Sequence, residues 1–93
     1  MIKSIRHKGL KRFFETGNTS GIQAKHAQLL RQRLAVLNRA KSIDDIRFFQ
    51  NYNLHQLQGK ESPRWSIKVN GNWRLTFEFN EADIYVLDYE DYH

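Results

Sequence analysis

The spacing of apolar residues changes once along the chain, near residue 53, and this change limits the possible folds more than any other feature. Apolar residues recur every three or four positions through 27–37, which is typical of a helix. They alternate with polar residues through 65–69 and 73–79, which is typical of half-buried strands. Asn70-Gly71 stands between these two runs and predicts a type I′ hairpin turn, in which both central residues have positive φ. Helices followed by a meander predict an α+β fold, with N-terminal helices packed on one face of a C-terminal antiparallel sheet.

Local signals place the expected elements along this order. Gly17 is a plausible stop for the first helix, and Ser42 to Asp45 form the capping box of a short third helix. A turn is expected at 59–63, and a second reversal at 80–83 leads into the last strand. The full set is a short strand at 2–6, helices at 8–15, around 27–37 and after 42, and strands at 54–57, 65–69, 73–79 and from 83 onward.

Size and composition narrow the class of protein. A chain of 93 residues predicts one domain spanning 1–93. The absence of cysteine excludes disulfides and thiolate metal sites. No apolar run approaches the ~20 residues of a membrane span, and the N-terminus lacks the apolar core of a signal peptide. We therefore expect a cytoplasmic protein that does not interact with membranes.

Positive charge is concentrated in the first half of the chain. Residues 1–43 contain ten Lys and Arg residues and one acid, whereas residues 44–93 contain five bases and nine acids. This imbalance predicts a polyanionic partner, with nucleic acid favoured over an acidic protein; ordinary solvated helix faces are the other explanation. We expect His7 and His26 at the surface and the bases of the long helix, Arg33 among them, facing solvent. The candidate contacts are Lys8, Lys11, Arg12, Lys25 and Arg31.

Arg74 is expected on the side of the sheet that the helices leave open. If the apolar residues of 73–79 face the helices, then Arg74 points the other way, together with Thr76 and Glu78. A guanidinium on an open sheet face can bind a phosphate through two parallel hydrogen bonds. The alternative is a structural ion pair between Arg74 and Glu78 or a carboxylate of a neighbouring strand.

Five residues can converge near one end of a meander and supply the chemistry of RNA cleavage. In that reaction the 2′-OH attacks the adjacent phosphate, which requires a base, an acid and a cation. Imidazole titrates near neutral pH, and guanidinium remains charged, so no metal or cofactor is needed. The histidines also lack the spacing of a zinc site. A structural interpretation makes His55 a half-buried core residue and Tyr92 an anchor for the tail. The candidate catalytic residues are His55, Arg74, Asp91, Tyr92 and His93.

Several stretches together form a more specific pattern. They are Met1-Ile2-Lys3-Ser4, Lys8-Gly9-Leu10, Gly21-Ile22, Leu54-His55-Gln56-Leu57-Gln58-Gly59, Trp65-Ser66-Ile67-Lys68-Val69-Asn70, Asn72-Trp73-Arg74-Leu75-Thr76-Phe77 and the terminal Asp91-Tyr92-His93. With these motifs the chain resembles, over essentially its whole length, the HigB family of bacterial toxins within the RelE/ParE superfamily. The resemblance implies a RelE-like, microbial-ribonuclease-type fold. It also implies an endoribonuclease that cleaves messenger RNA in the ribosomal A site, without metal, during translation.

The resemblance also implies partners and site residues. The partners are a cognate HigA-like antitoxin with a helix-turn-helix domain, which makes the contact with DNA, and the ribosome, on whose RNA the basic helices would dock. The family's catalytic positions fall on the five candidates named above. One position departs from the family pattern, because Gln58 stands where members often carry Lys. Lys60 is the candidate substitute, and both residues are candidate RNA contacts.

Two other functions compete with the ribonuclease. ParE-like relatives share the fold but poison DNA gyrase by binding it, without RNA chemistry, and have no expected need for both His55 and a terminal His93. A plain nucleic-acid-binding or antitoxin-like module would bind RNA in a salt-sensitive way without cutting it.

Overall fold

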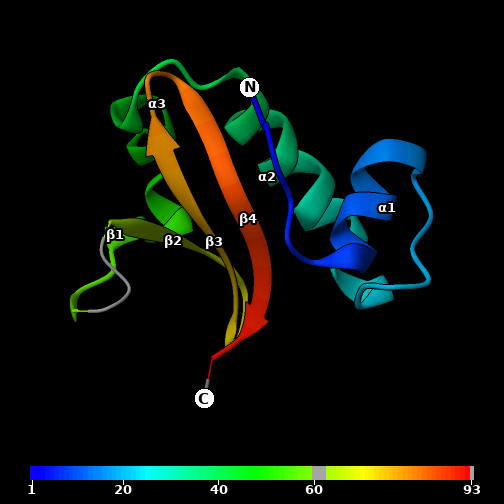
Figure 1. The fold of residues 1–93 in the computed structure, drawn as a ribbon. Coiled ribbons are helices and arrows are strands. Elements are labelled where there is room, and N and C mark those ends of the chain that lie inside the picture. Colours follow the sequence, from blue (N-terminus) through cyan, green and yellow to red (C-terminus); the bar gives the residue numbers. More distant parts are fainter. Residues whose placement is uncertain (60–62, 93) are drawn as a thin grey trace.

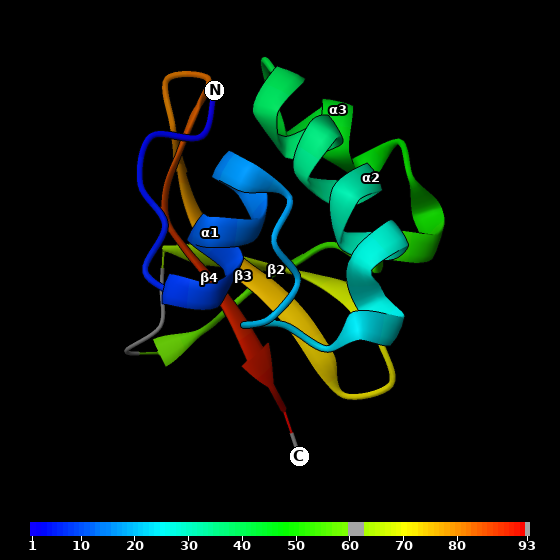
Figure 2. The same ribbon diagram turned by 90° about the vertical axis from the view of Figure 1, so that its right-hand side faces the viewer.

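The computed structural model of the protein describes residues 1–59 and 63–92. Four strands form one antiparallel sheet in the order β1–β2–β3–β4 (Figure 1). The helices cover one face of this sheet, as Figure 2 shows by looking onto the helices with the sheet behind them. This arrangement confirms the α+β prediction. The elements are α1 (Lys8–Thr16), α2 (Ala27–Arg39), α3 (Ile43–Arg47), β1 (His55–Gln56), β2 (Arg64–Asn70), β3 (Trp73–Asn80) and β4 (Asp83–Asp91).

The helix ends follow the local signals in the sequence. Gly17 adopts φ 83° after α1, and its N–H donates to the carbonyl of Phe13, which confirms the predicted stop. Ser42 and Asp45 form the expected capping box at the start of α3. No helix among the described residues is long and apolar enough to cross a membrane.

The core lies between the helices and the sheet. Leu30, Leu34 and Leu37 of α2 are buried there, as their spacing predicts, and so are Leu75 and Phe77 of β3. The expected strand at 2–6 is reduced to two isolated parallel bridges, which join Ile2 to Ile84 and Ile5 to Leu87. The predicted turn at 59–63 lies partly outside the described residues.

Arg33 does not face solvent, contrary to the sequence-based expectation. The residue is 4% exposed, and its guanidinium lies 4.3 Å from the ring centroid of Tyr52. Its Nε donates to the carbonyl of Lys68 at 2.8 Å. A planar, weakly hydrated guanidinium can be buried when an aromatic face and a carbonyl replace its water. Arg33 thus links α2 to β2.

His26 is also buried rather than at the surface. The residue is 1% exposed, and its Nδ1 lies 2.6 Å from the hydroxyl of Tyr89. A 3-10 turn at Ala24–His26 precedes α2 and directs the ring onto Trp73 and Tyr89. Burial, with a smaller effect from the charge of Lys25, lowers the pKa of His26 below its ordinary value of 6.5.

His7 is likewise not a simple surface residue. Its Nδ1 accepts a hydrogen bond from the N–H of Leu10 at 3.0 Å, which caps α1. Its ring also meets Tyr89 edge-on at 5.3 Å between centroids.

Both predicted reversals are present, but the type predicted for the first one is wrong. Asn70 pairs with Trp73, so the turn residues are Gly71 and Asn72, and of these only Gly71 has positive φ. This is the pattern of a type II′ turn, in which glycine occupies the first central position. The type I′ pattern occurs instead between β3 and β4, where Glu81 and Ala82 adopt φ 50° and 69°.

One bulge interrupts the pairing of β3 with β4. Thr76 pairs with Asp88 and Glu78 pairs with Tyr85, so β4 contains one extra residue over this interval. Val86 lies in the bulge with φ 50°, an uncommon conformation for a β-branched residue. Its N–H donates to Oγ of Ser4 at 2.8 Å.

Replacing Glu81 by Asn and Ala82 by Gly should stabilise the protein by about 1 kcal/mol, because these residues adopt positive φ with less strain. The measurement is the urea unfolding midpoint at constant m-value. Ala35→Gly on the exposed face of α2 is the control and should destabilise by a similar amount. No gain from the double substitution would contradict the strain at this turn.

The burial of His26 should make stability depend on pH. Its folded pKa is lowered, so the unfolded chain binds the proton more tightly. The stability that neutral, buried His26 contributes to the folded protein is therefore complete above the ordinary pKa of 6.5, and it is lost as pH falls below that value. Urea unfolding at about pH 8 and about pH 5.5 measures this loss.

Two substitutions identify the histidine responsible for this dependence. His26→Gln should lower stability at every pH and flatten the pH dependence. His55→Gln, at an exposed histidine, should retain the wild-type dependence. An unchanged slope in His26→Gln would assign the effect to another group.

Candidate functional site

The face of the sheet away from the helices carries polar side chains in cross-strand rows. Residues paired directly across antiparallel strands point to the same face, with Cβ atoms ~4.5–5.5 Å apart. Arg74 is paired with Lys68 on one side and Glu90 on the other, and its own strand alternates it with the buried Leu75. Arg74 therefore lies on the open face, as predicted. The three rows are Arg64, Glu78 and Tyr85; His55, Ser66, Thr76 and Asp88; and Lys68, Arg74 and Glu90.

Arg74 is held by backbone carbonyls rather than by a carboxylate. Its Nη1 donates to the carbonyl of Gly71 at 2.8 Å and to that of Trp73 at 3.0 Å. The predicted alternative, an ion pair with Glu78, is absent, and no other carboxylate among the described residues pairs with Arg74. Lys68 is exposed on the adjacent strand. The open face therefore presents two neighbouring cations.

His55 is exposed on β1 and is not a core residue. Its Nδ1 lies 3.1 Å from the carbonyl oxygen of Asn53. A carbonyl oxygen can only accept, so this contact places a proton on Nδ1 and directs proton exchange to Nε2. Since neighbouring strands lie ~4.8 Å apart, β1 is about 10 Å from β3. The side chains of His55 and Arg74 would have to approach one substrate from different strands.

The C-terminal candidates lie where β4 ends. Asp91 pairs with Trp73 and so begins on the face that carries Tyr89, whose pKa is raised by burial and also by the charge of Asp91. Tyr92 extends the pairing beyond β4, because its N–H donates to the carbonyl of Asn72 at 2.8 Å. His93 lies outside the described residues. The structure thus places Asp91 on the opposite face of the sheet from Arg74, at the same end.

The basic residues of the helical half are not near Arg74. All five are exposed and lie on α1, α2 or the turn before α2, which cover the other face of the sheet (Figure 2). Gln58 is exposed in the loop after β1, and Lys60 lies outside the described residues. The helical residues are Lys8, Lys11, Arg12, Lys25 and Arg31.

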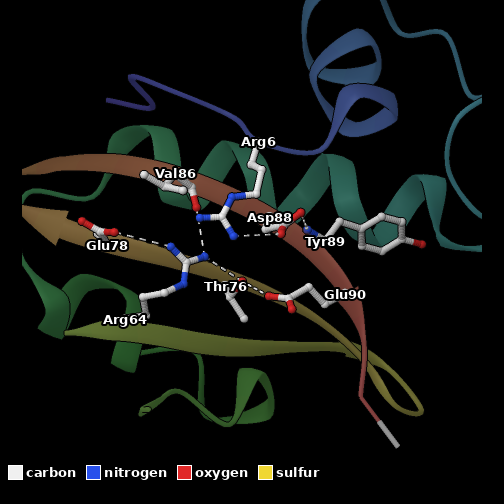
Figure 3. A network of polar contacts seen from close by, with 8 residues as sticks. All are labelled: Arg6, Arg64, Thr76, Glu78, Val86, Asp88, Tyr89 and Glu90. Atoms are coloured by element: carbon white, nitrogen blue, oxygen red, sulfur yellow. Dashed lines mark hydrogen bonds and ion pairs between the residues drawn. The ribbon is translucent and has the colours of Figure 1, made fainter. Parts of the chain in front are cut away.

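A polar network that the sequence analysis did not identify fills the middle of the open face (Figure 3). Arg64 is only 7% exposed, and its Nη2 donates to Oγ1 of Thr76 at 2.8 Å and to the carbonyl of Val86 at 2.9 Å. The hydroxyl of Thr76 donates to Oε2 of Glu90. Arg64 Nη1 also lies 3.7 Å from Oε2 of Glu78. The sequence did contain a signal for the position of Arg64, because strand alternation over 64–68 places it on the same face of the sheet as Lys68.

A second ion pair lies beside this network. Nη1 of Arg6 is 3.6 Å from Oδ2 of Asp88, so this side chain extends toward β4 from the N-terminal segment, which lies along the edge of that strand (Figure 3). In the described part of the chain, no three His, Asp or Glu side chains are grouped closely enough to hold a metal ion.

Comparison with known proteins identifies the family. Residues 3–93 match the family described as the RelE-like toxin of the type II toxin–antitoxin system HigB. The chain is 47% identical over 93 residues to the Endoribonuclease HigB of Proteus vulgaris, and the match covers all of both chains. It is 31% identical over 87 residues to an uncharacterized protein of Haemophilus influenzae, covering 90% of this chain and 86% of the other. The chain therefore belongs to the HigB-like family of RelE-like toxins of type II toxin–antitoxin systems.

Proposed function

We propose that this toxin is an endoribonuclease that cleaves messenger RNA in the ribosomal A site and so inhibits translation. One observation carries the proposal: Arg74 and Lys68 are adjacent on the open sheet face, and neither forms an ion pair with a described carboxylate. The full-length similarity of the chain to an endoribonuclease of the same family also supports endoribonuclease activity. We further propose that the toxin acts in the cytoplasm as a single domain spanning residues 1–93.

The chemistry needs only side chains of this chain. The 2′-oxygen forms a bond to phosphorus while the bond from phosphorus to the 5′-oxygen breaks, leaving a 2′,3′-cyclic phosphate and a 5′-hydroxyl. A base removes the 2′-OH proton, an acid protonates the 5′-oxygen, and cations stabilise the negative phosphorane.

We assign the roles as follows. Arg74 binds the non-bridging phosphate oxygens, since its Nη1 is anchored and its other donors can form a bidentate contact. One of His55 and His93 is the acid, Asp91 or the other histidine is the base, and Tyr92 orients the nucleotide. Asp91 and Arg74 start on opposite faces, so the RNA would have to pass around the end of β4.

Lys68 suits the role of the second cation on the phosphate. Gln58 carries no charge at the position where family members often have Lys. Lys68 is exposed and directly paired with Arg74, so both ammonium and guanidinium can reach one phosphate.

Two macromolecular partners belong to this proposal. A type II toxin implies a cognate antitoxin, and we propose that it is HigA-like, with a helix-turn-helix domain that makes the only contact with DNA. We propose that five exposed bases of the helical half dock on ribosomal RNA, namely Lys8, Lys11, Arg12, Lys25 and Arg31. RNA bound to the open face and ribosomal RNA bound to the helices would then hold the toxin from two sides.

His55→Ala, Arg74→Ala and removal of His93 should each reduce cleavage by ~10²–10⁴-fold, which corresponds to about 3–5 kcal/mol of transition-state stabilisation. The measurement is primer extension on mRNA in purified translating ribosomes. Arg39→Ala removes an exposed cation from α2 and should leave cleavage unchanged. A wild-type protein that poisons cells without cutting mRNA would instead favour the gyrase poison.

Neutralising α1 should weaken ribosome binding without changing the site. In Lys8→Gln/Lys11→Gln/Arg12→Gln, each lost phosphate contact should reduce the salt dependence of log K by ~0.7–0.9. Ribosome affinity measured at several salt concentrations gives this slope. Lys41→Gln is the matched control at an exposed base outside the docking set. An unchanged slope in the triple variant would move ribosome docking to another surface.

A further inference from the structure

Glu90 is directly opposite Arg74 but does not bind it. The two residues pair across β3 and β4 on the open face. Opposite charges at such positions ordinarily attract each other. Here Nη1 of Arg74 donates to two backbone carbonyls, and Oε2 of Glu90 accepts from the hydroxyl of Thr76. The carboxylate of Glu90, which is paired with Arg74 across the strands, is thus bound by Thr76 instead of by Arg74.

We propose that Thr76 is a positioning residue that holds the Glu90 carboxylate away from Arg74, so that the guanidinium stays available for an RNA phosphate. This inference rests on the proposed function, in which Arg74 binds the phosphate. The role of Thr76 and Glu90 is indirect, because neither residue contacts the substrate in this proposal.

The hydrogen-bond directions make Thr76 suitable for this task. A hydroxyl has one proton to donate, and its oxygen also accepts. Arg64 donates to Oγ1 of Thr76, so the oxygen is engaged as an acceptor and the proton is directed to Glu90. Thr76 is fully buried, and its β-branched side chain has few rotamers. In this chain of hydrogen bonds Arg64 therefore donates to Thr76, and Thr76 donates to Glu90.

Arg64 is itself held through Nη2, which forms two hydrogen bonds. Its Nη2 also donates to the carbonyl of Val86, and its Nη1 lies near Glu78 (Figure 3). The bulge at Val86, with its positive φ, turns that carbonyl toward the guanidinium. Strained backbone of this kind persists only where surrounding contacts fix it.

Releasing Glu90 would disable Arg74 electrostatically. An ion pair between them would use the donors that a phosphate needs and would place a negative charge beside the phosphate. The loss of one hydrogen bond to a charged group corresponds to roughly a 10- to 100-fold loss of affinity.

The test uses Thr76→Val, which removes the hydroxyl and keeps the branched shape. The probe is a fluorescent RNA oligonucleotide with 2′-O-methyl groups, which cannot be cut by 2′-OH attack, and affinity is read by anisotropy at about 50 mM salt. We expect Thr76→Val to bind at least about tenfold more weakly than wild type. Thr76→Ser, which keeps the hydroxyl, should bind as wild type does.

Removing the released charge should restore binding. Thr76→Val/Glu90→Gln should bind within about threefold of Glu90→Gln alone, which corresponds to under 1 kcal/mol of remaining difference. A merely structural role of Thr76 predicts no such rescue. If Thr76→Val does not fold, Thr76→Ala with and without Glu90→Gln replaces it, and the thermal midpoint of each variant reports folding.

A second measurement needs no RNA. The Nε–Hε signal of Arg74 in ¹⁵N-labelled protein should shift in Thr76→Val, as Glu90 reaches the guanidinium, and should return in the double variant.

Specific results would overturn the proposal. They are wild-type affinity in Thr76→Val, a double variant that stays weak, an unmoved Arg74 signal, or oligonucleotide binding that does not change in Arg74→Ala. The expected binding pattern without mRNA cleavage by any variant on ribosomes would support the role of Thr76. It would at the same time refute the ribonuclease.

Discussion

The register of β2, β3 and β4 is the constraint on which the rest of the structure depends. It aligns Ile67, Leu75 and Tyr89 toward the helices, and it aligns the row of Lys68, Arg74 and Glu90 on the open face. A slip of one residue in any strand would exchange the two faces of that strand. Packing of the helices against one face therefore also determines which charges meet on the other face.

The bulge at Val86 is the one place where β4 departs from simple alternation, and it serves both faces. Ile84 and Leu87 are three residues apart, a spacing that in a regular strand would place them on opposite faces. Both are fully buried, because the extra residue of the bulge lies between them and turns both side chains toward the core. The same distortion directs the carbonyl of Val86 to Arg64. A positive φ at a β-branched residue costs about 1–3 kcal/mol, and the contacts of Ser4 and Arg64 with Val86 offset part of that cost.

The sequence predicted the features that depend on near neighbours. Local signals predicted the helix end at Gly17, the capping box at Ser42 and both reversals. Strand alternation predicted the face on which Arg74 lies. The burial of Arg33 and His26 could not be predicted this way, because their partners, Tyr52 and Tyr89, are distant in the sequence. The Arg64–Thr76–Glu90 network depends on the bulge at Val86. The bulge could not be predicted, because β4 contains no glycine, proline or asparagine that would indicate one.

The net charge of a segment is a poor guide to the charge of its surface. Residues 44–93 are acidic overall, yet they carry the adjacent cations Arg74 and Lys68. The explanation is that the acids on the open face are engaged elsewhere: Glu78 approaches Arg64, Asp88 approaches Arg6, and Glu90 accepts from Thr76. Each engaged carboxylate is directed along the sheet or toward the N-terminal segment. Among the described residues, Arg74 and Lys68 therefore form no ion pair with a carboxylate on the face that the helices leave open, although acids outnumber bases in this half of the chain.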